Sequence, residues 1–164
     1  MDLAELYAAW DTAQREYSVG WSNAYRCPPG CARCCETSPA VPVSPVEARA
    51  LATAVEALDA KTRALIASRS AGIVSQMRES DRPLEEDVAV RAMGERSGLT
   101  GACPLLIDGR CAVYEARPLI CRAFGFAADE HGFFMGCEIL GGILEQCEET
   151  ILPQWDAATR LIPR

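Results

Sequence analysis

Cysteine is the residue type of this chain whose number and spacing indicate chemistry, since nine cysteines are present. Four of them fall within nine consecutive positions and the rest follow in the C-terminal half: Cys27, Cys31, Cys34 and Cys35, then Cys103, Cys111, Cys121, Cys137 and Cys147. Thiolates are soft ligands that select zinc, copper(I) or iron–sulfur clusters, and closely spaced cysteines completed by distant ones are typical of such sites. The pattern therefore predicts a cysteine-ligated metal site assembled from both halves of the chain.

The adjacent pair Cys34–Cys35 indicates that this site is not a simple four-cysteine centre. Neighbouring side chains usually diverge, so both rarely suit one tetrahedral ion. Either one of the two is a spectator, or the two serve different metals in a polynuclear centre or in two separate sites. The alternative for any cysteine is burial as a small apolar side chain. We favour that alternative for Cys147, which follows Leu144 in a helical stretch.

A disulfide framework is the less favoured use of these thiols. Residues 1–5 lack the basic and apolar regions of a secretion signal, so we expect a cytoplasmic location, where thiols stay reduced. An odd number of cysteines also disfavours complete pairing. No apolar run approaches the roughly 20 residues of a membrane span, and no membrane partner is expected.

Composition limits the class of protein. The 164 residues are 49% hydrophobic and 24% charged, which is typical of one globular domain over residues 1–164. The net charge of −7 argues against a nucleic-acid binder, because phosphate neutralisation needs a basic face. Four arginines stand close to cysteines in the sequence and are predicted either to donate hydrogen bonds to sulfur or to be solvated: Arg33, Arg110, Arg117 and Arg122.

The first cysteine block must be positioned by the helices around it. Residues 2–17 have an apolar stripe at helical spacing, and Asp2 with Glu5 forms a capping pair at its start. The prolines and glycines of residues 20–30 predict a constrained loop, which holds Cys27.

A second helix is predicted from Ser44 to about Leu58. Ser44 is a good N-cap, Pro45 suits the first helical position, and Glu47 stands three residues after the cap. Further helices are predicted over residues 61–77 and 83–93, followed by one or two over residues 139–162.

A β-hairpin is predicted over residues 103–114, because Asp108–Gly109 is a strong two-residue turn between two apolar runs. Residues 117–121 are expected to form a short helical turn that holds Cys121, and a glycine-rich loop is expected around His131. The predicted fold is therefore mainly α with a small β-hairpin, and its irregular loops are organised around the cysteine-ligated metal site.

Few side chains other than cysteine are candidates for chemistry. His131, the sole histidine, is expected to be exposed, with a metal nitrogen ligand as the alternative. Tyr114 and Glu115 are the best candidates for chemistry by other side chains near the site, although hairpin packing and a surface carboxylate are favoured for them.

Two sequence blocks carry a resemblance to a known family. The first is Cys27-Pro-Pro-Gly-Cys31-Ala-Arg-Cys34-Cys35, and the second runs from Cys103-Pro-Leu-Leu-Ile-Asp-Gly109-Arg-Cys111 through Tyr114-Glu115-Ala-Arg117-Pro118 to Cys121-Arg122-Ala-Phe124. Together they resemble the CxxCxxCC family, whose usual description is a zinc- or iron-chelating domain. The resemblance covers about residues 27–137 and implies a metal-linked set of eight: Cys27, Cys31, Cys34, Cys35, Cys103, Cys111, Cys121 and Cys137.

Two classes of function follow from these observations, and the sequence does not decide whether the chain is an enzyme. The first is a metal-binding cysteine-cluster protein that holds zinc or an iron centre, with metal ions as its partners. The second is an iron–sulfur enzyme that carries out redox chemistry or modifies proteins with S-adenosylmethionine. A similar cysteine cluster in flagellin lysine methylases implies this second class, and Cys27-x3-Cys31-x2-Cys34 has the spacing of radical S-adenosylmethionine enzymes. However, their barrels need about 200 residues and many strands, which this chain does not offer.

Overall fold

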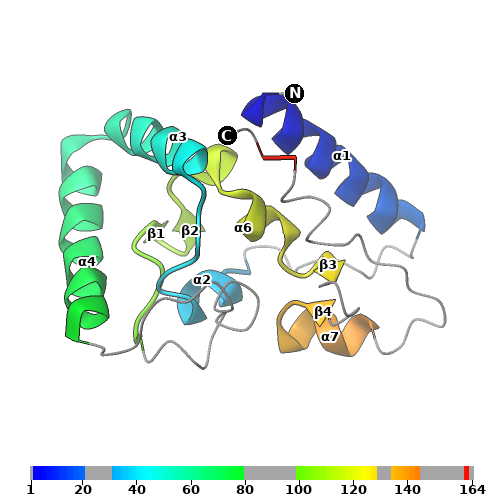
Figure 1. Cartoon of the computed structure of the whole chain (residues 1–164). Helices are drawn as coiled ribbons and strands as arrows, with labels where there is room; N and C mark the ends of the chain where they lie inside the picture. The colour runs from blue at the N-terminus through cyan, green and yellow to red at the C-terminus, as the bar shows by residue number, and fades with distance from the viewer. Residues whose placement is uncertain (1, 21–30, 80–98, 129–133, 145–160, 163–164) are drawn as a thin grey trace. The chain divides into compact units, whose positions relative to one another are not determined.

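The computed structural model describes residues 2–20, 31–79, 99–128, 134–144 and 161–162 (Figure 1). It is mostly helical with two small antiparallel sheets of two strands each, which confirms the predicted class. The described chain separates into two compact units. The first contains Met1–Pro29, Ser44–Glu47 and Pro118–Arg164, and the second contains Gly30–Val43 and Ala48–Arg117. A single domain over residues 1–164 stays a prediction.

The first unit is built on the contact between helix α1 (Leu3–Gly20) and the short helix α6 (Leu119–Ala123). The predicted capping pair is confirmed: the backbone N–H of Asp2 donates to Glu5, and that of Glu5 donates to Asp2, each at 2.8 Å. Leu6 and Tyr7 of α1 are buried in the core of this unit. The burial of apolar side chains on both helices is what holds the pair together.

Glu47 is a buried carboxylate that joins three parts of the first unit. It lies at the start of helix α3 (Pro45–Glu56) and forms the predicted capping box with Ser44, whose Oγ donates to Oε2 at 2.8 Å. Its other oxygen accepts the backbone N–H of Leu119 at 2.8 Å and the hydroxyl of Tyr7 at 3.2 Å. Burial, followed by the neighbouring Glu47 carboxylate, raises the pKa of Tyr7. Every oxygen of this buried group is therefore used.

A second small sheet follows α6 and was not predicted. Strands β3 (Ala127–Ala128) and β4 (Phe134–Met135) pair in antiparallel register, where the sequence indicated only a glycine-rich loop. Two-residue strands are too short to show a period of two, which explains the omission. Helix α7 (Glu138–Leu144) comes next, and Gly125, with a φ of +88°, lies directly against its Leu140.

Helix α4 (Ala60–Glu79) supports the second unit. Its N-terminus is capped by Asp59, which accepts the backbone N–H of Thr62 at 3.0 Å, and Arg63 donates at 3.1 Å to the carbonyl oxygen of Glu56 in the last turn of α3. The helix begins one residue earlier than predicted because Asp59 is its cap. Ile66 and Ile73 form the buried stripe of α4.

Polar side chains of the same helix hold the segment that carries the hairpin. Arg69 donates at 2.5 Å to the carbonyl oxygen of Leu106, and Gln76 both donates to the carbonyl and accepts from the N–H of Thr100. Arg69 and Gln76 are about two turns apart along α4, so the segment leading into the hairpin runs beside the helix.

The predicted hairpin is confirmed. Strands β1 (Leu106–Ile107) and β2 (Arg110–Cys111) are antiparallel, with Leu106 opposite Cys111. Asp108 and Gly109 both have positive φ, 47° and 75°, as the turn that suits a twisted two-residue hairpin requires. A 3-10 turn, η1 (Tyr114–Ala116), follows.

Several predictions fall on residues outside the described ranges: the helix over residues 83–93, the loop at His131, most of the helix over residues 139–162, and the positions of Cys27 and Cys147. Among the helices that are described, none is long and apolar enough to cross a membrane.

Candidate metal centre

The adjacent cysteines of the first block lie on a short helix. Helix α2 (Arg33–Thr37) carries Cys34 and Cys35, both of them half-buried, and an exposed Cys31 precedes it. The Cys35 thiol donates a hydrogen bond to the Cys34 sulfur. The helical backbone therefore keeps these neighbours together, whereas an extended chain would make them diverge.

The second block meets the first through a backbone hydrogen bond. The N–H of Cys103 donates to the carbonyl oxygen of Cys35 at 2.7 Å, across 68 residues of sequence. Cys103 lies before the first strand of the hairpin, and its own carbonyl accepts the N–H of Leu106 at 3.0 Å. Cys111 is on β2, the second strand of that hairpin. The two cysteine blocks of the second unit are thus brought side by side.

Four thiols of this unit interact through their charges. The pKa of Cys34 is lowered to about 6, chiefly by the hydrogen bond from Cys35. That bond raises the pKa of Cys35, and burial and the thiols of Cys34, Cys103 and Cys111 raise it further. Burial is the first cause of the raised pKa of Cys103 and of Cys111, and Cys34 adds to both. Like charges of this kind within one low-dielectric cluster repel one another unless a cation balances them.

Backbone N–H groups favour the thiolate form of three of these cysteines. Those of Leu105 and Leu106 lower the pKa of Cys103, that of Val113 lowers the pKa of Cys111, and those of Cys34 and Cys35 lower the pKa of Cys34. Such bonds oppose the effect of burial, because an N–H donor favours the charged thiolate. Sequence reasoning missed these donors. The same local relationship nevertheless occurs twice: the backbone N–H two residues after the cysteine favours the thiolate at both Cys103 and Cys111.

Arg117 is the arginine that acts on this cluster. Its guanidinium lowers the pKa of both Cys34 and Cys111, which belong to different cysteine blocks. It lies over the ring of Tyr114, 3.9 Å from the centroid, and its backbone N–H donates to the Tyr114 carbonyl at 3.2 Å. Tyr114 is 54% exposed, so its ring contributes little to the core.

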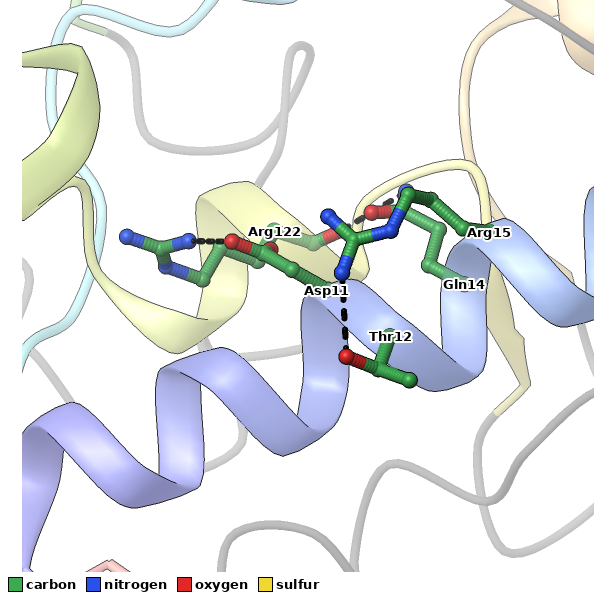
Figure 2. Close-up of polar contacts among 5 residues, drawn as sticks. All are labelled: Asp11, Thr12, Gln14, Arg15 and Arg122. Carbon is green, nitrogen blue, oxygen red and sulfur yellow. Dashed lines mark hydrogen bonds and ion pairs between the residues drawn. The ribbon is translucent and has the colours of Figure 1, made fainter.

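Arg122 was expected either beside sulfur or in solvent, and the structure corrects the solvent alternative. It is buried, and its Nη1 forms an ion pair with Asp11 (Figure 2). Its guanidinium lies 4.2 Å from the centroid of the Tyr7 ring. Gln14 also holds α6 by donating to the Arg122 carbonyl at 3.3 Å. The charge of Arg122 is therefore used in the packing of α1 against α6. The other two predicted arginines, Arg33 and Arg110, are exposed.

The remaining predicted cysteines belong to the first unit or to parts outside the described ranges. Cys121 is exposed on α6, and Cys137, directly before α7, is half-buried. Cys27 falls outside the described residues. The eight-cysteine set implied by the sequence stays a prediction.

The donor chemistry of the second unit fits a soft metal ion. Four thiols from two blocks, with backbone N–H groups and an arginine charge that favour the thiolate form, are suited to zinc or iron and unsuited to magnesium or calcium. Within the described ranges, no three cysteine, histidine, aspartate or glutamate side chains are close enough together to hold one ion as they stand. The thiols are neighbours without forming a complete coordination shell.

Comparison with known proteins agrees with this chemistry. Neither the curated proteins nor the solved structures contain a significant match to the chain. A family model does match residues 26–139, about two thirds of the length, and these residues include all eight predicted cysteines and exclude Cys147. Its description is "Putative zinc- or iron-chelating domain", so the metal that the family is described as chelating is zinc or iron. The chain belongs to the CxxCxxCC family.

Proposed function

We propose that this protein chelates zinc or iron through a thiolate centre formed around Cys34, Cys35, Cys103 and Cys111. The observation that carries the proposal is the 2.7 Å hydrogen bond from the Cys103 N–H to the Cys35 carbonyl, because it joins the two cysteine blocks in one place. The family description supports the same function. Once bound, the metal links segments that are distant in sequence, and its binding free energy stabilises the fold.

We further propose that the chain holds more than one ion. The second unit contains five cysteines in its described part, one more than a tetrahedral ion uses: Cys31, Cys34, Cys35, Cys103 and Cys111. Cys27, Cys121 and Cys137 would supply further thiolates. Eight thiolates fill the coordination shells of two tetrahedral ions without any sharing.

Metal analysis of the protein tests this proposal. The chain is purified without air, and zinc, iron and acid-labile sulfide are counted per chain. Stoichiometric zinc, or iron without sulfide, supports a chelating protein. Iron with equal sulfide and a strong visible absorption band instead supports the iron–sulfur enzyme, for which no described residue offers specific evidence. A chain that takes up neither zinc nor iron contradicts both functions.

Serine substitutions then locate the centre. Cys34→Ser and Cys103→Ser, one from each block, are expected to lower the metal bound per chain, because serine oxygen is a poor ligand for soft ions. Cys147→Ser is the matched control, since this cysteine lies outside the residues that the family model matches. Equal metal content in all three variants would contradict the proposed ligands.

A further inference from the structure

Two polar side chains of helix α4 bind the backbone of the segment that carries Cys103. Gln76 binds both backbone groups of Thr100: its Oε1 accepts the N–H at 2.8 Å, and its Nε2 donates to the carbonyl oxygen at 3.2 Å. Arg69 donates at 2.5 Å to the carbonyl oxygen of Leu106. The two anchored residues stand three positions before and three positions after Cys103, so this cysteine lies midway between the anchors.

Apolar burial does not hold this segment. All side chains from Leu99 to Ile107 are exposed or half-buried. Helix α4, in contrast, packs into the second unit through the buried side chains of Ile66 and Ile73. Arg69 and Gln76 recur at helical spacing with these two residues, so they lie on the same face of the helix. Hydrogen bonds from that face therefore attach the segment to α4.

The anchored segment connects α4 to the first cysteine block. The Cys103 carbonyl accepts the N–H of Leu106 at 3.0 Å, and the Cys103 N–H donates to the carbonyl oxygen of Cys35 at 2.7 Å. Because the carbonyl of Leu106 is itself bound by Arg69, hydrogen bonds run in series from α4 through this segment to α2. Helix α4 contains no cysteine, yet it is linked to both cysteine blocks.

Such a link matters for metal binding because the centre needs thiols of both blocks in one place. A free segment would have to be ordered when the metal arrives, and the entropy lost in that step would weaken binding. The affinity falls in proportion to the fraction of metal-free chains that already hold the ligand in its binding position. Hydrogen bonds formed before the metal binds therefore raise the affinity without any contact to the metal.

We propose that Gln76 and Arg69 are positioning residues of the metal centre: by holding residues 100–106 against α4, they keep Cys103 beside Cys35 before any metal is bound. The inference rests on the proposed metal-chelating function and deepens it. It assigns a task in metal binding to a helix without cysteines. Its two parts are separable, because placement is measured without metal and affinity is measured with it.

Four variants on α4 test the anchors. Gln76→Met and Arg69→Met remove the bonds to the segment and keep unbranched side chains that favour a helix. Arg69→Lys keeps a donor for the carbonyl oxygen and should restore part of the loss. Arg63→Ala is the matched control, since this guanidinium also donates to backbone carbonyls, those of Glu56 and Leu58, but near the start of the helix and not to the cysteine segment.

Two measurements on the full chain report on the anchors. Zinc affinity is measured by competition with a coloured chelator. The rate at which iodoacetamide alkylates each cysteine of the reduced, metal-free protein is measured by mass spectrometry. Cys121, exposed in the other unit, is the internal reference and should react at the wild-type rate in every variant.

We expect Gln76→Met and Arg69→Met each to bind zinc about five-fold more weakly, the ratio that corresponds to about one net hydrogen bond. The half-buried Cys103 should be alkylated faster in both variants by a similar factor, because it leaves its place more often. Arg69→Lys should fall between Arg69→Met and the wild type. Arg63→Ala should equal the wild type in both measurements.

A merely structural role would have different consequences. In that case Arg63→Ala would lose as much zinc affinity as Gln76→Met, or the alkylation of Cys121 would rise together with that of Cys103. Either result, or a wild-type alkylation rate of Cys103 in both anchor variants, would overturn the inference and leave the proposed function intact. A wild-type chain that takes up neither zinc nor iron would instead overturn the function, and this inference with it.

Discussion

The backbone N–H of Leu119 donates a hydrogen bond of 2.8 Å to Oε1 of Glu47, 72 residues earlier in the chain. The first turn of α3 and the first turn of α6 thereby share one carboxylate. Leu119 and Glu47 are both almost fully buried, at 0% and 3% exposure. A helix start has backbone N–H groups without partners in the helix, and here a distant side chain supplies one of them.

Replacement of this carboxylate should destabilise the first unit strongly. Glu47→Ala leaves the Leu119 N–H and the Tyr7 hydroxyl without their buried acceptor, and we expect the free energy of unfolding to fall by about 3 kcal/mol. Tyr7→Phe removes only one of these bonds and should cost about 1 kcal/mol. Urea unfolding measures both. Equal losses in the two variants would show that Glu47 stabilises the unit only through its hydrogen bond with Tyr7.

The ion pair between Asp11 and Arg122 provides a second stability prediction. Asp11→Asn keeps the shape of the side chain but removes its charge next to a guanidinium that is 3% exposed, so we expect a loss of about 2 kcal/mol. Arg15→Ala is the control on the same helix, because its bond to Thr12 is exposed and should contribute less than about 0.5 kcal/mol. Comparable losses from the two substitutions would contradict the assigned role of the pair.

Local sequence signals predicted the fold well where one short segment contains both partners. The capping boxes at Asp2 and Ser44 and the Asp108–Gly109 hairpin are of this kind, and all three are confirmed. The second use of Glu47 could not be predicted, because it depends on how α1 and α6 come together. The start of α4 at Ala60 could have been predicted from the sequence, since Asp59 with Thr62 is a capping signal.

The site was predicted from cysteine spacing, and its supporting groups were not. Spacing identifies soft ligands, but it cannot show which backbone N–H groups point at sulfur or which of several nearby arginines faces the cluster. By sequence alone, Arg117 and Arg122 were equally good candidates for a side chain that donates hydrogen bonds to sulfur. Only their tertiary surroundings separate them. Arg117 lies over the Tyr114 ring and lowers the pKa of two thiols, whereas Arg122 contacts Asp11 and Tyr7.

The metal-free protein should lose stability at high pH. Burial raises the pKa of Cys103 and Cys111 in the folded chain above the ordinary thiol value of 9.0. Groups with a raised folded pKa contribute stability that is complete below the unfolded pKa and is lost as the pH rises through the folded one. We therefore expect the free energy of unfolding, measured in urea with a chelator and a reductant, to decline above about pH 9.

Metal binding should show the opposite dependence on pH. Thiols release their protons when they ligate a metal, so the affinity for zinc should increase from pH 6 to pH 8 in the wild type. Cys103→Ala is the control for the loss of stability at high pH, because it removes one of the buried thiols. The free energy of unfolding of its metal-free form should decline less at high pH. An unchanged decline in this variant would assign the effect to other groups, such as Tyr7.

Gly125 and Leu140 form a close contact that a single methyl group would break. A Cβ at residue 125 would overlap with Cδ1 of Leu140, and the φ of +88° is unfavourable for any residue with a Cβ. Gly125→Ala should therefore cost about 3 kcal/mol of the free energy of unfolding, from backbone strain and overpacking together.

Leu140→Ala should itself cost about 3 kcal/mol, because this side chain is 1% exposed. The double variant relieves the overlap and keeps only the backbone strain, so its loss should be smaller than the sum of the two by at least about 1 kcal/mol. Strict additivity in this cycle would mean that the path from α6 to β3 can move away from α7, and the contact would then not determine where α7 packs.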